Sequence, residues 1–185
     1  MKLRFLLPLL GLLLVATGCS NSNQTVKTNK YYAKASASPL ISVNYAAADK
    51  LLAQLQHNLG PNNTLIIATL ANIDQLESSS TLGRIISEQV ASRFTQKGYR
   101  MVELKFRNNL YISQGEGELM LTRQVSELAN AHDAQAVVVG TYAQASNSIF
   151  VNLKVVQPNS NIVLAVHDYV LPLDDNNRQM LRRIR

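Results

Sequence analysis

Three histidines are the side chains in this 185-residue sequence that come closest to a catalytic or metal site. His132 and His167 are each followed by an aspartate, Asp133 and Asp168, and two such pairs could converge on a metal ion or serve a hydrolase. The spacing of these residues along the chain does not require such a site. His132 continues the apolar stripe of a predicted helix, which is typical of a hydrogen-bonded core histidine, and His57 lies near the polar side of another helix. The sequence favours structural roles over a metal or catalytic role.

A pair of carboxylates, Glu116 and Glu118, flanks Gly117. To act as general acid and base they would need environments that separate their pKa values. Acidic groups at a helix N-terminus complement its dipole, and this is the simpler explanation of the pair. The sequence contains neither a glycine-rich phosphate loop nor a G-x-S-x-G nucleophile elbow. We therefore expect no enzyme and no cofactor.

The single cysteine, Cys19, points to a different chemistry. Lys2 and Arg4 precede an apolar run over residues 5–16, which is typical of a signal peptide and too short to span a bilayer. The run Ala16-Thr17-Gly18-Cys19 resembles a bacterial lipobox, although Ala16 stands where leucine is usual. The alternative is ordinary signal cleavage that leaves a free thiol. We predict a lipoprotein whose Cys19 carries a diacylglycerol and a palmitate, and three acyl chains hold far more firmly than one. Ser20, which is not aspartate, is typical of sorting to the outer membrane of a Gram-negative cell.

The charge distribution argues against a nucleic-acid partner. The net charge is +6, from 18 basic and 12 acidic residues, but residues 44–173 contain nine basic and ten acidic ones. The other nine basic residues lie toward the two ends of the chain, with only Asp174 and Asp175 to balance them. Tryptophan is absent, which weakens any interpretation that relies on stacking against bases.

These patterns divide the chain into four segments. Residues 1–18 are predicted to be the lipoprotein signal peptide, and residues 19–43 the lipidated cysteine and a flexible polar tether. Residues 44–173 are predicted to form one α/β domain, and residues 174–185 a basic tail that is either a short amphipathic helix or frayed. About 130 residues suffice for one domain with a core of its own.

The periodicity predicts the elements of the domain. A helix is expected from an N-cap at Asn44 to Gly60, followed by a strand over 65–70. A second helix, with candidate caps in Ser78-Ser79-Ser80 and a stop at Gly98, precedes a strand over 100–105. A third helix should open at 115–118 with His132 on its stripe, followed by a buried strand over 136–142 and a hairpin of 149–156 with 162–171. The order α-β-α-β-α-β-β-β predicts a small α/β sandwich with a mixed sheet.

Several motifs in this order resemble the FlgO family of flagellar outer-membrane lipoproteins. They are Ile66, Ala68-Thr69-Leu70, Asn72-Ile73-Asp74, Leu76-Glu77-Ser78-Ser79, Leu82-Gly83-Arg84, Arg93-Phe94, Gly98-Tyr99, Val102-Glu103-Leu104, Gly115-Glu116-Gly117-Glu118, Leu121 with Arg123, residues 134–142, His167-Asp168-Tyr169 and Leu171-Pro172-Leu173. The resemblance covers about residues 45–173.

The resemblance implies a lipoprotein on the periplasmic face of the outer membrane, needed for flagellar assembly or stability and for motility. Its acylated Cys19 would contact the inner leaflet. Its protein contacts would be flagellar ring proteins similar to FlgP and FlgT, and further copies of itself. The fold would be similar to TolB N-terminal and CsgG-type periplasmic domains. The family implies no catalytic residues.

The contact surface is predicted on loops, because rigid scaffolds present function there. Its candidate residues are Asp74, Glu77, Asn108, Glu116 and Glu118. Two alternatives remain open beside the flagellar ring component: a lipoprotein regulator of a cell-envelope enzyme, and a CsgG-like secretion component. A pore subunit would need long membrane-entering strands, whereas each strand predicted here is explained by the domain core.

Acylation can be tested by labelling cells with a radioactive or clickable fatty acid. The protein is expected to carry the label, and the Cys19→Ser variant to lack it, because the thiol is the attachment point. Label retained in Cys19→Ser, or no label in the unaltered protein, would contradict the prediction.

Overall fold

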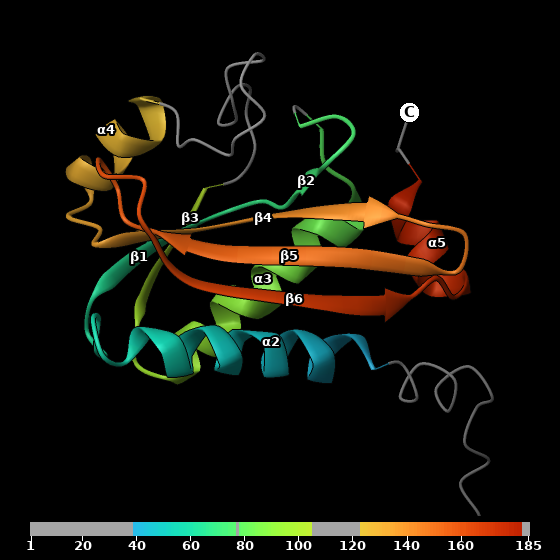
Figure 1. The fold of residues 1–185 in the computed structure, drawn as a ribbon, viewed down its shortest axis with the longest axis horizontal. Coiled ribbons are helices and arrows are strands. Elements are labelled where there is room, and N and C mark those ends of the chain that lie inside the picture. The colour runs from blue at the N-terminus through green and yellow to red at the C-terminus, as the bar shows by residue number, and fades with distance from the viewer. Residues whose placement is uncertain (1–38, 77, 105–122, 183–185) are drawn as a thin grey trace, which may run out of the picture. The chain divides into compact units, whose positions relative to one another are not determined.

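A mixed β-sheet runs through the middle of the protein, with helices on both of its faces (Figure 1). The computed structural model describes residues 39–76, 78–104 and 123–182. Its elements are α2 (Leu40–Leu55), β1 (Thr64–Ala68), β2 (Ala71–Asn72), α3 (Thr81–Gln96), β3 (Arg100–Leu104), α4 (Arg123–Ala131), β4 (Ala136–Gln144), β5 (Ser148–Val156), β6 (Val163–Pro172) and α5 (Asp175–Leu181).

The strand order is β3-β1-β4-β5-β6, and β2 pairs with β4 beyond the end of β1. The strands separated by helices, β3, β1 and β4, are parallel, whereas β4, β5 and β6 form an antiparallel meander. The predicted α/β sandwich with a mixed sheet is therefore confirmed. The two-residue strand β2 was not predicted, because so short a segment shows no periodicity.

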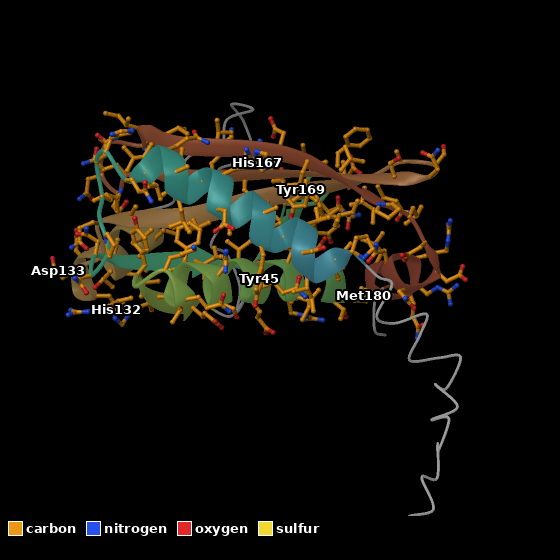
Figure 2. All side chains as sticks on the ribbon, turned by 90° about the horizontal axis from the view of Figure 1, so that it is seen from below. Tyr45, His132, Asp133, His167, Tyr169 and Met180 are labelled. Carbon is orange, nitrogen blue, oxygen red and sulfur yellow. The ribbon has the colours of Figure 1, made fainter. Side chains whose placement is uncertain are left out.

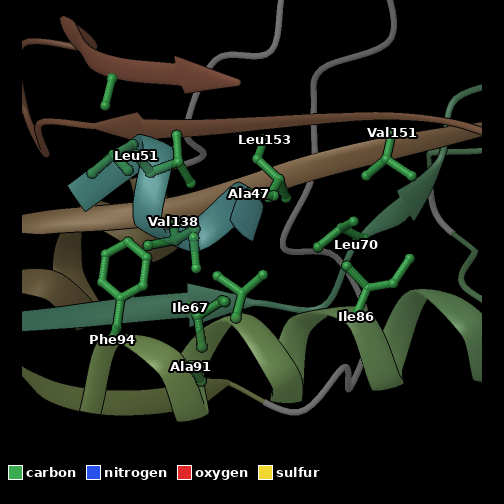
Figure 3. Close-up of a cluster of buried hydrophobic side chains, with 14 of the residues drawn as sticks. Ala47, Leu51, Ile67, Leu70, Ile86, Ala91, Phe94, Val138, Val151 and Leu153 are labelled. Carbon is green, nitrogen blue, oxygen red and sulfur yellow. The ribbon is translucent and has the colours of Figure 1, made fainter. Parts of the chain in front are cut away.

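The two faces of the sheet are covered unequally. Helices α2 and α3 pack on one face, where Leu51, Ile86 and Phe94 meet Ile67, Val138 and Leu153 in a continuous core (Figure 3). On the other face α4 places Val125 and Ala129 against inward-facing residues of β1, β4 and β5. Within the described residues no helix is long and apolar enough to cross a bilayer.

The first helix begins earlier than predicted. It starts at Leu40, behind Pro39, so four residues assigned to the tether belong to this helix, and it ends at Leu55, before Gly60. Asn44 is no N-cap but a fully buried residue inside the helix. Its Nδ2 donates to Gln89 Oε1 at 2.6 Å, and its Oδ1 accepts from the Tyr169 hydroxyl at 2.6 Å. Leu40 is itself 8% exposed, so tertiary packing sets where the helix starts.

The third helix also differs from the prediction. Residues 115–122, where it was expected to open, lie outside the described residues, and α4 ends at Ala131. His132 follows the helix and is exposed, so the expected core position is wrong. Asp133 adopts a left-handed conformation with φ of 49°, which ends the helix.

The C-terminal segment, predicted to be either a short amphipathic helix or frayed, forms a helix. Asp174 Oδ1 accepts from the backbone N–H of Asn177 at 2.8 Å and caps α5. Met180 and Leu181 pack against the same core as α2 and α3. The domain therefore extends through α5.

The outer edge of β6 is blocked at one point by a side chain from α2. The Gln54 amide donates to the carbonyl of Val166 at 2.9 Å and accepts from its N–H at 3.2 Å. It thus makes the two hydrogen bonds that a neighbouring strand would make, and unpaired strand edges are where sheets of different chains join.

The chain bends sharply between β1 and β2, and helix α3 holds the bend. Ser87 Oγ accepts from the N–H of Leu70 at 2.9 Å, and Ser79 Oγ donates to the Leu70 carbonyl at 2.6 Å. A Cβ on Gly83 would lie 2.7 Å from the Leu70 carbonyl oxygen, so glycine is required there. Of the three serines predicted as candidate caps, Ser78 to Ser80, it is Ser80 that caps α3 and accepts from the N–H of Gly83.

Ser87→Ala is expected to lower the free energy of unfolding by about 1–3 kcal/mol, because the Leu70 N–H would be buried without an acceptor. Urea unfolding of the protein measures it. Ser92→Ala is the matched control: Ser92 lies in the same helix, is exposed and donates only to Glu88, so its effect should stay within about 0.5 kcal/mol. Equal losses in the two variants would contradict the role assigned to Ser87.

Candidate functional site: an apolar hollow on the sheet

The histidines do not form a common site. His132 and Asp133 lie at one end of the domain, away from His167 on β6 (Figure 2). His167 stacks on Tyr169 with ring centroids 6.0 Å apart, whereas the neighbouring Asp168 points to the other face of the strand. Across residues 39–76, 78–104 and 123–182, no three His, Cys, Asp or Glu side chains are grouped so as to hold a metal. The two pairs therefore do not converge as the hydrolytic hypothesis required.

Of the predicted contact residues, only Asp74 is described. It is exposed in the loop after β2, where its backbone N–H donates to Asn72 Oδ1 at 3.0 Å. Glu77, Asn108, Glu116 and Glu118 lie outside the described residues, as does the acylation site Cys19.

The strongest surface feature is apolar and lies on the face of the sheet opposite α2 and α3. Phe150 on β5 and Val170 on β6 are directly paired across the two strands and are 53% and 51% exposed. Ile73, in the loop after β2, is 52% exposed. Together they border a hollow of about 260 Å³, lined by Ile73, Thr141, Ala143, Phe150, Val151, Asn152, Asp168, Tyr169 and Val170. Contiguous exposed apolar surface of this kind marks interaction sites.

The backbone fixes Ile73 beside the sheet. Its N–H donates to the carbonyl of Tyr142 at 3.0 Å, which continues the pairing of β2 with β4. The N–H of Asn72 donates to the carbonyl of Ser78 at 2.9 Å and closes the loop. Ile73 is therefore held in place by the same bend that Ser79, Ser87 and Gly83 stabilise.

One carboxylate lies in the wall of the hollow. Asn152 and Asp168 face each other across β5 and β6, and Asn152 Nδ2 donates to Asp168 Oδ1 at 2.5 Å. The bond orients the carboxylate, which is exposed and can accept a further donor.

Tyr169 fastens the strand beneath the hollow to the helices. Burial raises the pKa of its phenol well above the usual range, so the hydroxyl stays protonated and donates to Asn44.

The hollow is suited to binding and lacks the geometry of a catalytic site. Its lining combines apolar residues with one carboxylate, one amide and two hydroxyl-bearing residues, Thr141 and Tyr169, and none of these is a nucleophile with a base beside it. Sequence reasoning missed it. The signal was Phe150, an apolar residue at a position of β5 where the alternation predicts a polar, solvent-facing side chain.

Comparison with known proteins defines the class. The sequence model described as "FlgO protein" matches residues 45–176, so the chain belongs to the FlgO family. This membership supports the assignment to envelope-associated lipoproteins connected with the flagellum, a structural and non-enzymatic kind of protein. No curated protein sequence matches the chain.

Solved structures show the fold. The LpoB C-terminal domain from Escherichia coli superposes with a TM-score of 0.50 at 9% identity, over 69% of this chain and 97% of that one. The same domain from Salmonella enterica gives a TM-score of 0.44 at 10% identity, over 69% and 97% of the two chains. The PelC dodecamer from Paraburkholderia phytofirmans gives 0.42 at 11%, over 62% and 74%. At 9% identity, the similarity to the Escherichia coli domain confirms the α/β fold and nothing further.

The hollow's apolar side chains should be dispensable for folding. Phe150→Thr and Val170→Thr are each expected to change the free energy of unfolding by about 1 kcal/mol or less, because half of each side chain is already in water. Leu153→Ala, at a fully buried position of β5, should cost about 2–5 kcal/mol. Comparable losses at the exposed and buried positions in denaturant melts would show that the hollow belongs to the core.

Proposed function

We propose that this protein is a lipoprotein anchored by acylated Cys19 in the inner leaflet of the outer membrane, with its domain in the periplasm. It serves as a structural component of a flagellum-associated ring, and flagellar assembly or stability, and hence motility, depend on it. Membership of the FlgO family and the lone cysteine at the end of an apolar signal segment support this proposal.

The exposed hollow is the observation that carries the structural role. Ile73, Phe150 and Val170 present apolar surface that the fold does not use, and burying such surface drives protein association. The partners are flagellar ring proteins similar to FlgP and FlgT, or further copies of this chain. The predicted contact residue Asp74 adjoins Ile73, so the loop and the hollow form one surface.

The double variant Phe150→Thr/Val170→Thr is expected to reduce swimming in soft agar and the number of intact flagella, because the partner loses its apolar contact. Protein level and acylation should be unchanged. The matched control is Ile162→Thr, which alters an equally exposed residue, 57% accessible, in the turn between β5 and β6. Normal motility of the double variant, or an equal defect of the control, would refute this contact surface.

The partner itself can be identified by placing a photo-crosslinking amino acid at position 150 in cells. A crosslink to a flagellar ring protein supports the proposal. A crosslink to a cell-wall synthase or another envelope enzyme would instead favour the regulatory alternative, and one to a secretion apparatus the secretion alternative. Position 96 on the exposed part of α3 serves as the control and should give no crosslink to the same protein.

A further inference from the structure

Both ends of the described chain lie at one end of the domain. Helix α2 begins there at Leu40, and α5, which carries Met180, ends beside it, as two perpendicular views show (Figures 1 and 2). The first turn of α3 is at the same end, and α3 and α5 contact each other. We call this the terminal end and define it by the first turns of α2 and α3 together with α5.

Positive charge gathers at the terminal end. Arg84 in the first turn of α3 and Arg178 and Arg182 at α5 are all exposed. The sequence continues with Arg183 and Arg185, and Lys27, Lys30 and Lys34 precede α2. Asp174, the cap of α5, and the exposed Asp175 carry negative charge at the same end, so the excess of positive charge is +1 over the described residues and +3 with Arg183 and Arg185. Seven of the nine basic residues outside residues 44–173 thus belong to segments that join the domain at this end, and the other two, Lys2 and Arg4, lie in the predicted signal peptide.

An exposed apolar residue accompanies these arginines. Ile41, in the first turn of α2, is 56% exposed, whereas its neighbour Leu40 is buried in the core. An apolar side chain at the same end as guanidinium groups suits the boundary between headgroups and acyl chains. The isoleucine can enter the apolar layer while the arginines bind lipid phosphates, alone or in pairs.

We propose that the terminal end docks on an anionic phospholipid surface. Two observations favour a membrane as the partner of this end. Its arginines complement the charge of lipid phosphates, and the segment that leads to Cys19 joins the domain there. Each arginine near such a surface contributes about 1 kcal/mol, so the domain is oriented rather than held by this contact. The proposal goes beyond the flagellar role and does not depend on which protein binds the hollow.

Docking at this end fixes what the hollow faces. The strands run between the terminal end and the opposite end of the domain (Figure 1). With the terminal end on the membrane, the strands stand upright and the face bearing Phe150 and Val170 looks along the membrane plane, toward neighbouring proteins.

Vesicle binding tests the proposal with the mature chain carrying Cys19→Ser, so that no acyl chain contributes. The protein should bind vesicles of phosphatidylcholine with a third phosphatidylglycerol, bind pure phosphatidylcholine weakly, and lose binding at high salt. Arg178→Gln/Arg182→Gln should weaken binding by roughly five-fold to 30-fold, the upper value being the full loss of two such contacts. Lys97→Gln/Arg100→Gln removes two exposed charges near the other end of α3 and should change binding less than two-fold, about the size of a general charge effect.

An equal loss in the two double variants would show that net charge alone drives binding and would overturn the proposal. No loss in the arginine variant would overturn it as well, and would leave an acidic protein surface as the occupant of this end.

A fluorescent label reports the orientation directly. In the Cys19→Ser background, Ile41→Cys and Gln96→Cys each supply one thiol for an environment-sensitive dye. The dye at position 41 should shift to the blue on anionic vesicles, and the dye at position 96, at the other end of α3, should not. A shift at 96 without one at 41 would refute the assigned orientation, whatever the outcome of the motility experiments.

Discussion

The burial of the sheet's two faces is the constraint on which the rest of this structure depends. Two 16-residue helices, α2 and α3, cover most of one face and, together with α5, bury a continuous apolar core. In the part of the chain that the structure describes, the nine-residue helix α4 alone packs on the other face, over β1, β4 and the end of β5. Apolar residues on the rest of that face therefore meet water, and the candidate site exists because the covering is incomplete.

The motifs that relate the chain to its family act mainly through this architecture. Ser79 and Gly83 bind or approach the backbone of Leu70, and Tyr169 joins β6 to Asn44 in α2. In each of these contacts the partner is another part of the protein itself. Their effect on function is indirect, because the bend they fix also places Ile73 beside Phe150. A family motif can thus define a fold and position a binding surface without forming a catalytic site.

Much of the fold was predictable where the determining signals are local. The capping serines before α3, the stop at Gly98 and the alternation along β5 each lie within a few residues of what they determine. The start of α2 could not be predicted in this way. Asn44 has the side chain of a helix cap, but it is buried inside the helix and forms hydrogen bonds with residues 45 and 125 positions away. His132 fitted a helical stripe, yet α4 ends one residue before it. The hollow was missed because its three apolar residues meet only through the pairing of β2, β4, β5 and β6.

The amide of Gln54 on the edge of β6 has a consequence under the proposed lipid anchoring. An anchor of that kind would concentrate copies in two dimensions, where an open strand edge would let the sheets of neighbouring molecules fuse through backbone hydrogen bonds. Because one side chain from α2 occupies both backbone groups of Val166, such fusion is impeded where it would otherwise begin. Association is left to side-chain surfaces, whose contacts are selective for a partner and can be reversed.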